Sequence, residues 1–202
     1  MDITKAVVCI VSVVQMQLDK KDRMIISLFA KDPSVSQEQI AKEVDLSQPS
    51  VAVRIRKLKD SGAIQTITGI NPLKMGLYMA KVDIASNNPS VILDMFRDCP
   101  YFANGFTISG RNNLCLMFVS ENIATLESIV NGHLRSSKFV KELDFNIIIS
   151  AERDLVLPTV LTQEHSKTPP CGVEIQCRDC RSFTEKKCMG CPVTGQYQGW
   201  FY

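Results

Sequence analysis

The sequence lacks a long apolar run. Its longest stretch, AVVCIVSVV at 6–14, is too short for a bilayer-spanning helix, which needs roughly 20 apolar residues. The same region makes a poor signal peptide, because Asp2 spoils the basic start and QMQLDKKD offers no small-residue cleavage site. We therefore expect a cytoplasmic protein with no membrane partner.

A strong charge of either sign is also missing. The formal net charge is +2, so no argument for a nucleic-acid or membrane partner follows from the whole chain, and any such argument depends on where the charges lie. The sequence shows no internal repeat and no low-complexity tract. Its 202 residues suffice for one large domain or for two to three small ones.

The eight cysteines are unevenly spread along the chain. Cys9, Cys99 and Cys115 are isolated, and we expect them to serve as small core residues. The other five lie within 171–191. In a reducing compartment so dense a group predicts metal binding before disulfides.

Residues 18–62 have the pattern of three short helices. Asp19 can cap the first, DKKDRMIISLFAKD, and Ser36 can cap the second, SQEQIAKEV. After a tight turn Ser47 can cap the third, which Gly62 then terminates. Two short helices joined by a tight turn and braced by a preceding one indicate a helix-turn-helix.

Residues 63–157 change to a mixed pattern. The apolar alternation predicts strands at 77–85, 103–110, 113–120 and 140–150, with helices at 89–98 and 123–134. This βαββαβ order indicates a ferredoxin-like sheet with both helices on one face. The strand at 113–120 is apolar on both faces, so we expect its second face to be buried against a partner subunit.

These features together resemble the Lrp/AsnC (feast/famine) transcription regulators, with an archaeal-like character. The matching positions are Leu46, Ser47, Val51, Arg54, Ile55, Leu58, Gly62 and Ile64, followed by a wing-like strand and NPLKMG at 71–76. The resemblance covers residues 18–157. It implies a dimer with its sheets face to face, often assembling further, and a recognition helix at 47–60 that contacts double-stranded DNA.

The chain departs from this family pattern in three places. The usual acidic turn is replaced by SGRNN at 109–113, the cysteine-rich tail is outside the common core, and the apolar leader is unusual. The segment that starts at Met16 looks more like a typical family start than Met1 does.

We accordingly predict an α+β chain: a winged helix-turn-helix, a βαββαβ ferredoxin-like domain of RAM type, and a small cysteine-rich module. The expected segments are an apolar extension (1–17), a DNA-binding domain (18–66), an oligomerisation and candidate effector domain (67–160), a linker (161–170) and a metal-binding tail (171–202).

The third helix carries the candidate DNA contacts, and it has no acidic residue before Asp60. Lysine and arginine neutralise phosphates, while glutamine, serine or an arginine can reach base edges in the major groove. The candidate DNA-binding residues are Gln48, Ser50, Arg54, Arg56, Lys57 and Lys59. Arg54 lies at the margin of the apolar stripe, where a salt bridge within the motif is the alternative.

The tail offers four thiols with the spacing C-x2-C-x7-C-x2-C, at Cys177, Cys180, Cys188 and Cys191. Four thiolates bind zinc tetrahedrally, and we expect a structural zinc ion, with an iron–sulfur cluster or redox disulfides as alternatives. Cys171 is an alternative ligand. We expect loss of the ion to affect mainly the fold of the tail.

Three further hypotheses remain open. By the family resemblance a small-molecule effector would bind near Arg111, Asn112 and Asn113, although these residues equally suit an ordinary hairpin turn. A metal- or redox-sensing regulator would use the cysteines to control DNA release. An enzyme similar to the sirohaem decarboxylases could share the fold, but the chain has just two histidines, and we predict no catalytic residues.

Overall fold

The computed structural model describes residues 17–161, 163–166, 168–172 and 177–202. The predicted apolar extension therefore lies outside the described residues, apart from Gln17. The chain divides into two compact units, residues 1–66 and 67–202. No helix in the described ranges is long and apolar enough to cross a membrane.

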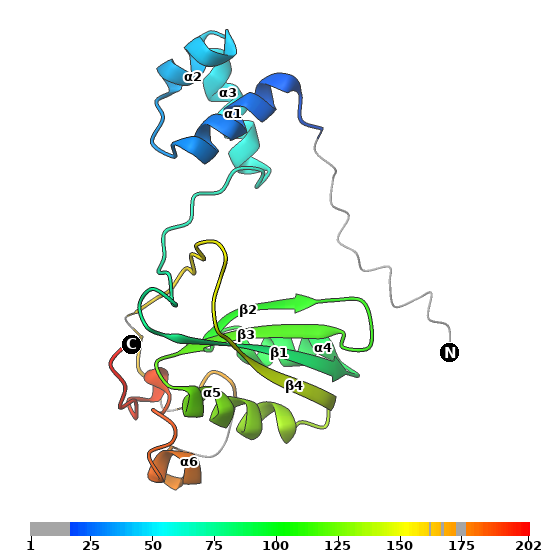
Figure 1. The fold of residues 1–202 in the computed structure, drawn as a ribbon, viewed down its shortest axis with the longest axis vertical. Coiled ribbons are helices and arrows are strands. Elements are labelled where there is room, and N and C mark those ends of the chain that lie inside the picture. The colour runs from blue at the N-terminus through cyan, green and yellow to red at the C-terminus, as the bar shows by residue number, and fades with distance from the viewer. Residues whose placement is uncertain (1–16, 162, 167, 173–176) are drawn as a thin grey trace. The chain divides into compact units, whose positions relative to one another are not determined.

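The described residues of the first unit, from Gln17 on, form three helices, α1 (Lys20–Lys31), α2 (Gln37–Val44) and α3 (Gln48–Asp60) (Figure 1). The predicted caps are confirmed for α1 and α2, where Asp19 and Ser36 each form a reciprocal capping box with the residue three positions on. Ser47 is the N-cap residue of α3, but its hydroxyl contacts that of Ser50 instead of a backbone N–H.

One apolar cluster holds the three helices together. Its most buried members are Ile25, Ile40, Val44, Val51, Ile55 and Leu58. Asp45 adopts a left-handed conformation (φ 51°) in the turn between α2 and α3. Gly62 does the same (φ 73°) directly after α3, which confirms it as the predicted helix stop.

The second unit is built on an antiparallel sheet in the order β2-β3-β1-β4. Its elements are β1 (Tyr78–Ser86), α4 (Pro89–Phe96), β2 (Phe102–Thr107), β3 (Leu114–Ser120), α5 (Ile123–Ile129), the π-helical turn η2 (Val130–Arg135) and β4 (Val140–Ile148). The predicted βαββαβ order is confirmed.

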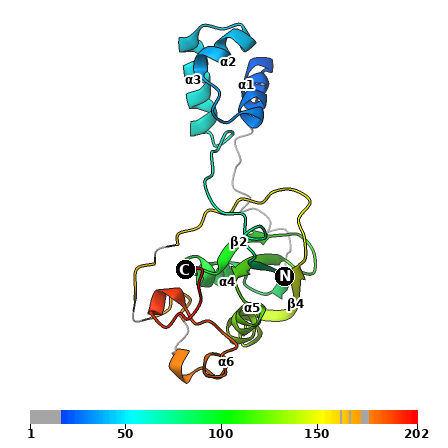
Figure 2. The same ribbon diagram turned by 60° about the vertical axis from the view of Figure 1, so that its left-hand side comes forward.

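The helices α4 and α5 lie on one face of this sheet (Figures 1 and 2). Alternate residues of β1 and β3 point into the core between sheet and helices, where Val82, Leu116 and Phe118 are buried. Phe96 at the end of α4 meets Phe118 edge-on, with ring centroids 5.0 Å apart. This core fixes the helices on one face and leaves the other face of the sheet for different partners.

The second face of β3 is covered differently from the prediction at one end. There Met79 and Val119 are buried in a cluster with Leu157 and the C-terminal Phe201 of the same chain. At the other end of this face Phe106 remains 46% exposed. The sequence assigned the whole second face to a partner subunit, whereas part of it is covered by the chain's own C-terminal residues.

The predicted wing-like strand is short in the structure. It is reduced to an isolated antiparallel bridge between Ile70 and Leu157. The NPLKMG segment that follows forms a turn, held to Asp154 by the side chains of Asn71 and Lys74. This turn leads directly into β1.

The cysteine-rich tail contains the short helices η3 (Cys177–Asp179), α6 (Arg181–Thr184) and η4 (Pro192–Thr194). It packs on the sheet domain: the Tyr101 hydroxyl donates to the Gly190 carbonyl (2.6 Å), and the Met189 N–H donates to Thr125 Oγ1 (3.0 Å). The last residues of the chain also contact the sheet domain, where the Tyr202 hydroxyl donates to the Pro100 carbonyl (2.6 Å).

Candidate nucleic-acid interface and cysteine-rich tail

The helix α3 presents a polar, basic face to solvent. Five of the six predicted DNA-binding residues are exposed on it: Gln48, Ser50, Arg56, Lys57 and Lys59. The buried stripe of Val51, Ile55 and Leu58 holds the opposite face against α1 and α2. Within the described part of the chain, none of the three cations on this face forms an ion pair with a carboxylate.

Arg54 has a different position from the other five. Its Nη1 atom lies 2.6 Å from Asp19 Oδ2 and 2.6 Å from Asp22 Oδ1, so the guanidinium connects α3 to the start of α1. Asp22 is buried, 6% exposed, and it also forms the capping box with Asp19. The salt bridge within the motif, which the sequence left open for Arg54, is thus present.

The electrostatics agree with this structural role. Two hydrogen bonds lower the pKa of Asp19. The larger effect comes from the Asp22 backbone N–H, and the smaller comes from the Arg54 guanidinium. Hydrogen bonds to Asp19 and Asp22 raise the pKa of Arg54. Asp19 and Arg54 therefore stay charged together, and the guanidinium orients α3 on α1 through its contacts with Asp19 and Asp22.

Val53 was missing from the predicted site, although it lies on the same exposed face. Its side chain is 68% exposed on a helix whose other apolar residues pack inward. An apolar side chain at such a position can contact a thymine methyl group. The sequence indicated Val53 only by its position away from the buried stripe of α3. An isolated exposed valine is ordinary and does not by itself indicate a site.

The predicted effector residues lie in the turn between β2 and β3. Arg111 Nη2 lies 2.6 Å from Glu142 Oε1, and the Asn113 amide bonds the Ser86 backbone at both its N–H and its carbonyl, at 2.8 Å each. The turn side chains thus tie β3 to β1 and β4. Effector binding at Arg111, Asn112 and Asn113 stays a prediction.

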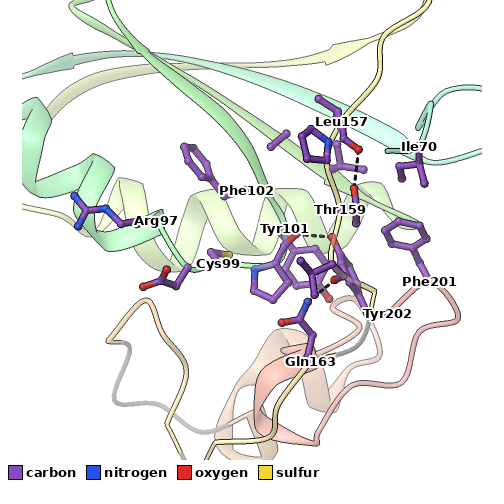
Figure 3. A pocket seen from close by; sticks show the side chains of 16 residues that line it. Ile70, Arg97, Cys99, Tyr101, Phe102, Leu157, Thr159, Gln163, Phe201 and Tyr202 are labelled. Carbon is purple, nitrogen blue, oxygen red and sulfur yellow. Dashed lines mark hydrogen bonds between the residues drawn. The ribbon is translucent and has the colours of Figure 1, made fainter. Parts of the chain in front are cut away.

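A hollow of about 350 Å³ opens elsewhere in the second unit, between the start of β2, residues 157–160, Gln163 and the C-terminal residues (Figure 3). Tyr101 and Tyr202 lie side by side in its wall, with ring centroids 5.4 Å apart. Phe201 and Leu157 add apolar surface, and Arg97 and Gln163 add polar groups. Because the C-terminal residues form part of this wall, the sequence pattern of the sheet domain could not indicate it.

Backbone N–H groups point at both sulfurs of the second Cys-x2-Cys pair. The Cys188 sulfur accepts a hydrogen bond from the Gly190 N–H, and the Cys191 sulfur accepts from Val193 and Thr194. Gly190 needs to be glycine: its φ is +85°, and a Cβ atom would lie 2.5 Å from the Gln196 carbonyl oxygen. Backbone N–H groups aimed at sulfur stabilise the thiolate form that binds metals.

Burial opposes these hydrogen bonds and is the larger effect, so the pKa of Cys188 and that of Cys191 are both raised. The thiols of Cys177 and Cys180 interact electrostatically with Cys188. However, no three histidine, cysteine or acidic side chains in the described ranges form a set that could hold one ion. The structure therefore brings the thiols into one region without assembling a complete ligand set.

His133 is half-buried in η2, where burial lowers its pKa. Its ring Nε2 lies 3.1 Å from the Cys171 sulfur and its Nδ1 lies 3.0 Å from the Ile129 carbonyl oxygen. A sheet-domain side chain is thus part of the contact with the cysteine-rich tail.

Comparison with known proteins supports the first unit as a DNA-binding domain. Residues 18–65 match a family described as winged helix-turn-helix DNA-binding. The transcriptional regulator AzlB of Bacillus subtilis is 23% identical over 146 residues, covering 69% of this chain and 93% of AzlB. The HTH-type transcriptional regulator LrpA of Pyrococcus horikoshii is 27% identical over 79 residues, covering 39% of this chain and 56% of LrpA.

Solved structures share the fold. AsnC of Escherichia coli superposes with a TM-score of 0.60 at 15% identity, covering 70% of this chain and 98% of AsnC. LrpC of Bacillus subtilis gives 0.57 at 24% identity, covering 68% and 99%. A regulator of Neisseria meningitidis in complex with L-Met gives 0.57 at 18% identity, covering 72% and 97%.

The chain is thus a winged helix-turn-helix protein with the Lrp/AsnC fold. The family match concerns the DNA-binding domain at 18–65, and the solved structures share the fold over about 70% of the chain.

Proposed function

We propose that the protein binds specific DNA sequences as an Lrp/AsnC-type regulator, in the cytoplasm where its DNA lies, with α3 as recognition helix and without enzymatic activity. The observation that carries this proposal is the exposed basic face of α3, whose cations are free of ion pairs among the described residues. Charges that form no ion pair within the protein are available to neutralise phosphates.

The residues on this face divide into two roles. Arg56, Lys57 and Lys59 lie in the second half of α3 and would contact phosphates, which sets affinity. Gln48 and Ser50 lie at its N-terminal end, the part of a recognition helix that reads base edges. Arg54 would hold the helix in place through Asp19 and Asp22 without contacting DNA.

A dimer or higher oligomer follows from the geometry of this kind of binding. One short helix contacts too few bases for specificity, whereas two related helices about 34 Å apart meet successive major grooves. The sheet face that carries Phe106 and Met117 is the surface we assign to the partner subunit, because Phe106 stays 46% exposed there. The Lys81–Asp83 ion pair on the same face would fix the register.

For the tail we propose a structural zinc ion bound by the cysteine cluster. The Cys-x2-Cys spacing and the N–H groups aimed at Cys188 and Cys191 support it. An ion shared by the four predicted cysteines would have to draw the two pairs together. Metal analysis of the purified protein tests this: zinc at one equivalent supports the proposal, and a metal-free, folded protein contradicts it.

The DNA proposal is tested by capturing sheared genomic DNA on the protein and measuring affinity for the most enriched fragment. The variant Arg56→Ala/Lys57→Ala should bind this fragment more weakly than the wild type, with the largest loss at low salt. Arg135→Ala/Arg153→Ala is the matched control, because it removes two exposed charges from the second unit. Equal affinity of the α3 variant and the wild type would overturn the assignment of the recognition helix.

A further inference from the structure

A histidine of the sheet domain and a cysteine of the tail form a close contact. His133 Nε2 lies 3.1 Å from the Cys171 sulfur, and the two residues are 38 positions apart in sequence. Three other contacts hold the tail in place nearby: Tyr101 to Gly190, Thr125 to Met189, and Tyr197 to Glu121. The pair therefore lies in a docked interface and not at a free end of the chain.

The second ring nitrogen determines which atom faces the sulfur. His133 Nδ1 lies 3.0 Å from the Ile129 carbonyl oxygen, which can accept but not donate, so Nδ1 carries a proton. In a neutral imidazole the other nitrogen, Nε2, then presents its lone pair. Metal-bound histidines have this arrangement, in which the distal N–H donates to a backbone carbonyl and fixes the ring.

The local helix geometry places the imidazole at this position. His133 lies within η2, where α5 widens into a π-helical turn. Such turns are rare and are found frequently at functional sites. The ring also packs on Phe96, with centroids 5.7 Å apart, so its orientation is restrained from two sides.

Two further thiols lie in the same region, although the described residues do not form a complete ligand set around the pair. The thiol of Cys191 interacts electrostatically with that of Cys171, and so does the thiol of Cys99 from the loop after α4. The Cys99 sulfur accepts hydrogen bonds from the backbone N–H groups of Tyr101 and Phe102. The Cys191 sulfur likewise accepts two backbone hydrogen bonds. Imidazole and thiolate together favour zinc and similar soft ions.

We propose that His133 and Cys171 are ligands of the tail's metal ion, so that the ion ties the cysteine-rich tail to the sheet domain. This inference rests on the proposed metal binding and changes its ligand set, which the sequence confined to cysteines. If the tail is held in this way, loss of the ion would change the structure of η2 and α5 as well as that of the tail. Loss of an ion bound by cysteines alone would change the fold of the tail alone.

The test is NMR of the full-length protein loaded with 113Cd, which substitutes for zinc and couples to the nitrogen of a bound imidazole. The chain has just two histidines, so the assignment needs one control. We expect one histidine ring nitrogen to show coupling to cadmium, and this signal should disappear in His133→Gln and persist in His165→Gln. Cadmium affinity should fall at least about tenfold in His133→Gln and in Cys171→Ser.

The failures of the two proposals give different results. Wild-type protein that binds cadmium with no coupling to either histidine would overturn the role of His133 and leave an all-cysteine site intact. Wild-type protein that is folded but binds neither cadmium nor zinc would overturn the metal proposal together with this inference. The coupling is read in the wild type, so the result does not depend on the stability of any variant.

Discussion

The hydrogen bond between Tyr101 and Gly190 gives the sharpest test of how the tail is held. Tyr101 is 4% exposed, and its hydroxyl donates to the buried Gly190 carbonyl at 2.6 Å. The change Tyr101→Phe keeps the ring and its contact with Tyr202 but removes the donor. A buried carbonyl without its partner costs about 1–3 kcal/mol.

This cost should appear as easier opening of the tail. At about 1.4 kcal/mol per factor of ten, it corresponds to roughly 5- to 140-fold faster hydrogen exchange at amides whose bonds depend on docking. The Met189 N–H, which donates to Thr125 Oγ1, is the amide to follow. Tyr202→Phe is the matched control. The Tyr202 hydroxyl donates to the Pro100 carbonyl at the same 2.6 Å distance, but its side chain is only half-buried, so we expect a smaller effect on exchange.

The reasoning would be refuted if exchange at Met189 in Tyr101→Phe matched the wild type while the variant remained fully folded. That result would mean that the tail opens independently of the Tyr101 bond. The coupling of the cysteine region to the sheet domain would then have to depend on other contacts.

Further predictions concern both units. In the first unit, Leu58→Ala should lower the free energy of unfolding by about 2–5 kcal/mol, because Leu58 is fully buried in the three-helix core; urea unfolding checks this, and a loss below the cost of one methylene group would contradict it. In the tail, burial and the Glu121 hydrogen bond raise the pKa of Tyr197 to about 12. The protonated phenol therefore contributes stability that is complete below the ordinary value of 10 and is lost as pH rises through about 12. Unfolding melts across this range should show a smaller loss in Tyr197→Phe than in the wild type, and not its absence, because burial also raises the pKa of Tyr101 and that of Tyr202. Finally, Gly190→Ala should undock the tail, since a Cβ atom would lie 2.5 Å from the Gln196 carbonyl oxygen; tail resistance to limited proteolysis at the wild-type level would count against this.

Much of the fold could be predicted from local signals. The caps at Asp19 and Ser36, the stop at Gly62 and the apolar alternation of β1 and β3 all act over a few residues, and the structure follows them. The exposed residues of α3 were likewise accessible, because helical periodicity separates them from the buried stripe. The π-helical turn at 130–135 interrupts the regular helix that was predicted at 123–134.

The parts that the sequence did not reveal depend on long-range contacts. The burial of Met79 and Val119 by Phe201, and the contact of His133 with Cys171, join segments 38 or more residues apart. From the sequence, Arg54 suited either a DNA contact or a salt bridge within the motif. The positions of Asp19 and Asp22, which lie more than 30 residues away in sequence, decide for the salt bridge. No local pattern carries such pairings, which is why the tail was expected to be separate from the sheet domain.

The central claim is that the exposed cations of α3 bind DNA phosphates. It is tested most directly by the dependence of DNA affinity on salt for the wild type and for Arg56→Ala/Lys57→Ala. Each phosphate contact contributes about 0.9 to the slope of log affinity against log salt. A dimer that loses two contacts per subunit should therefore have a slope smaller in magnitude by about 3.6. An unchanged slope would contradict the account.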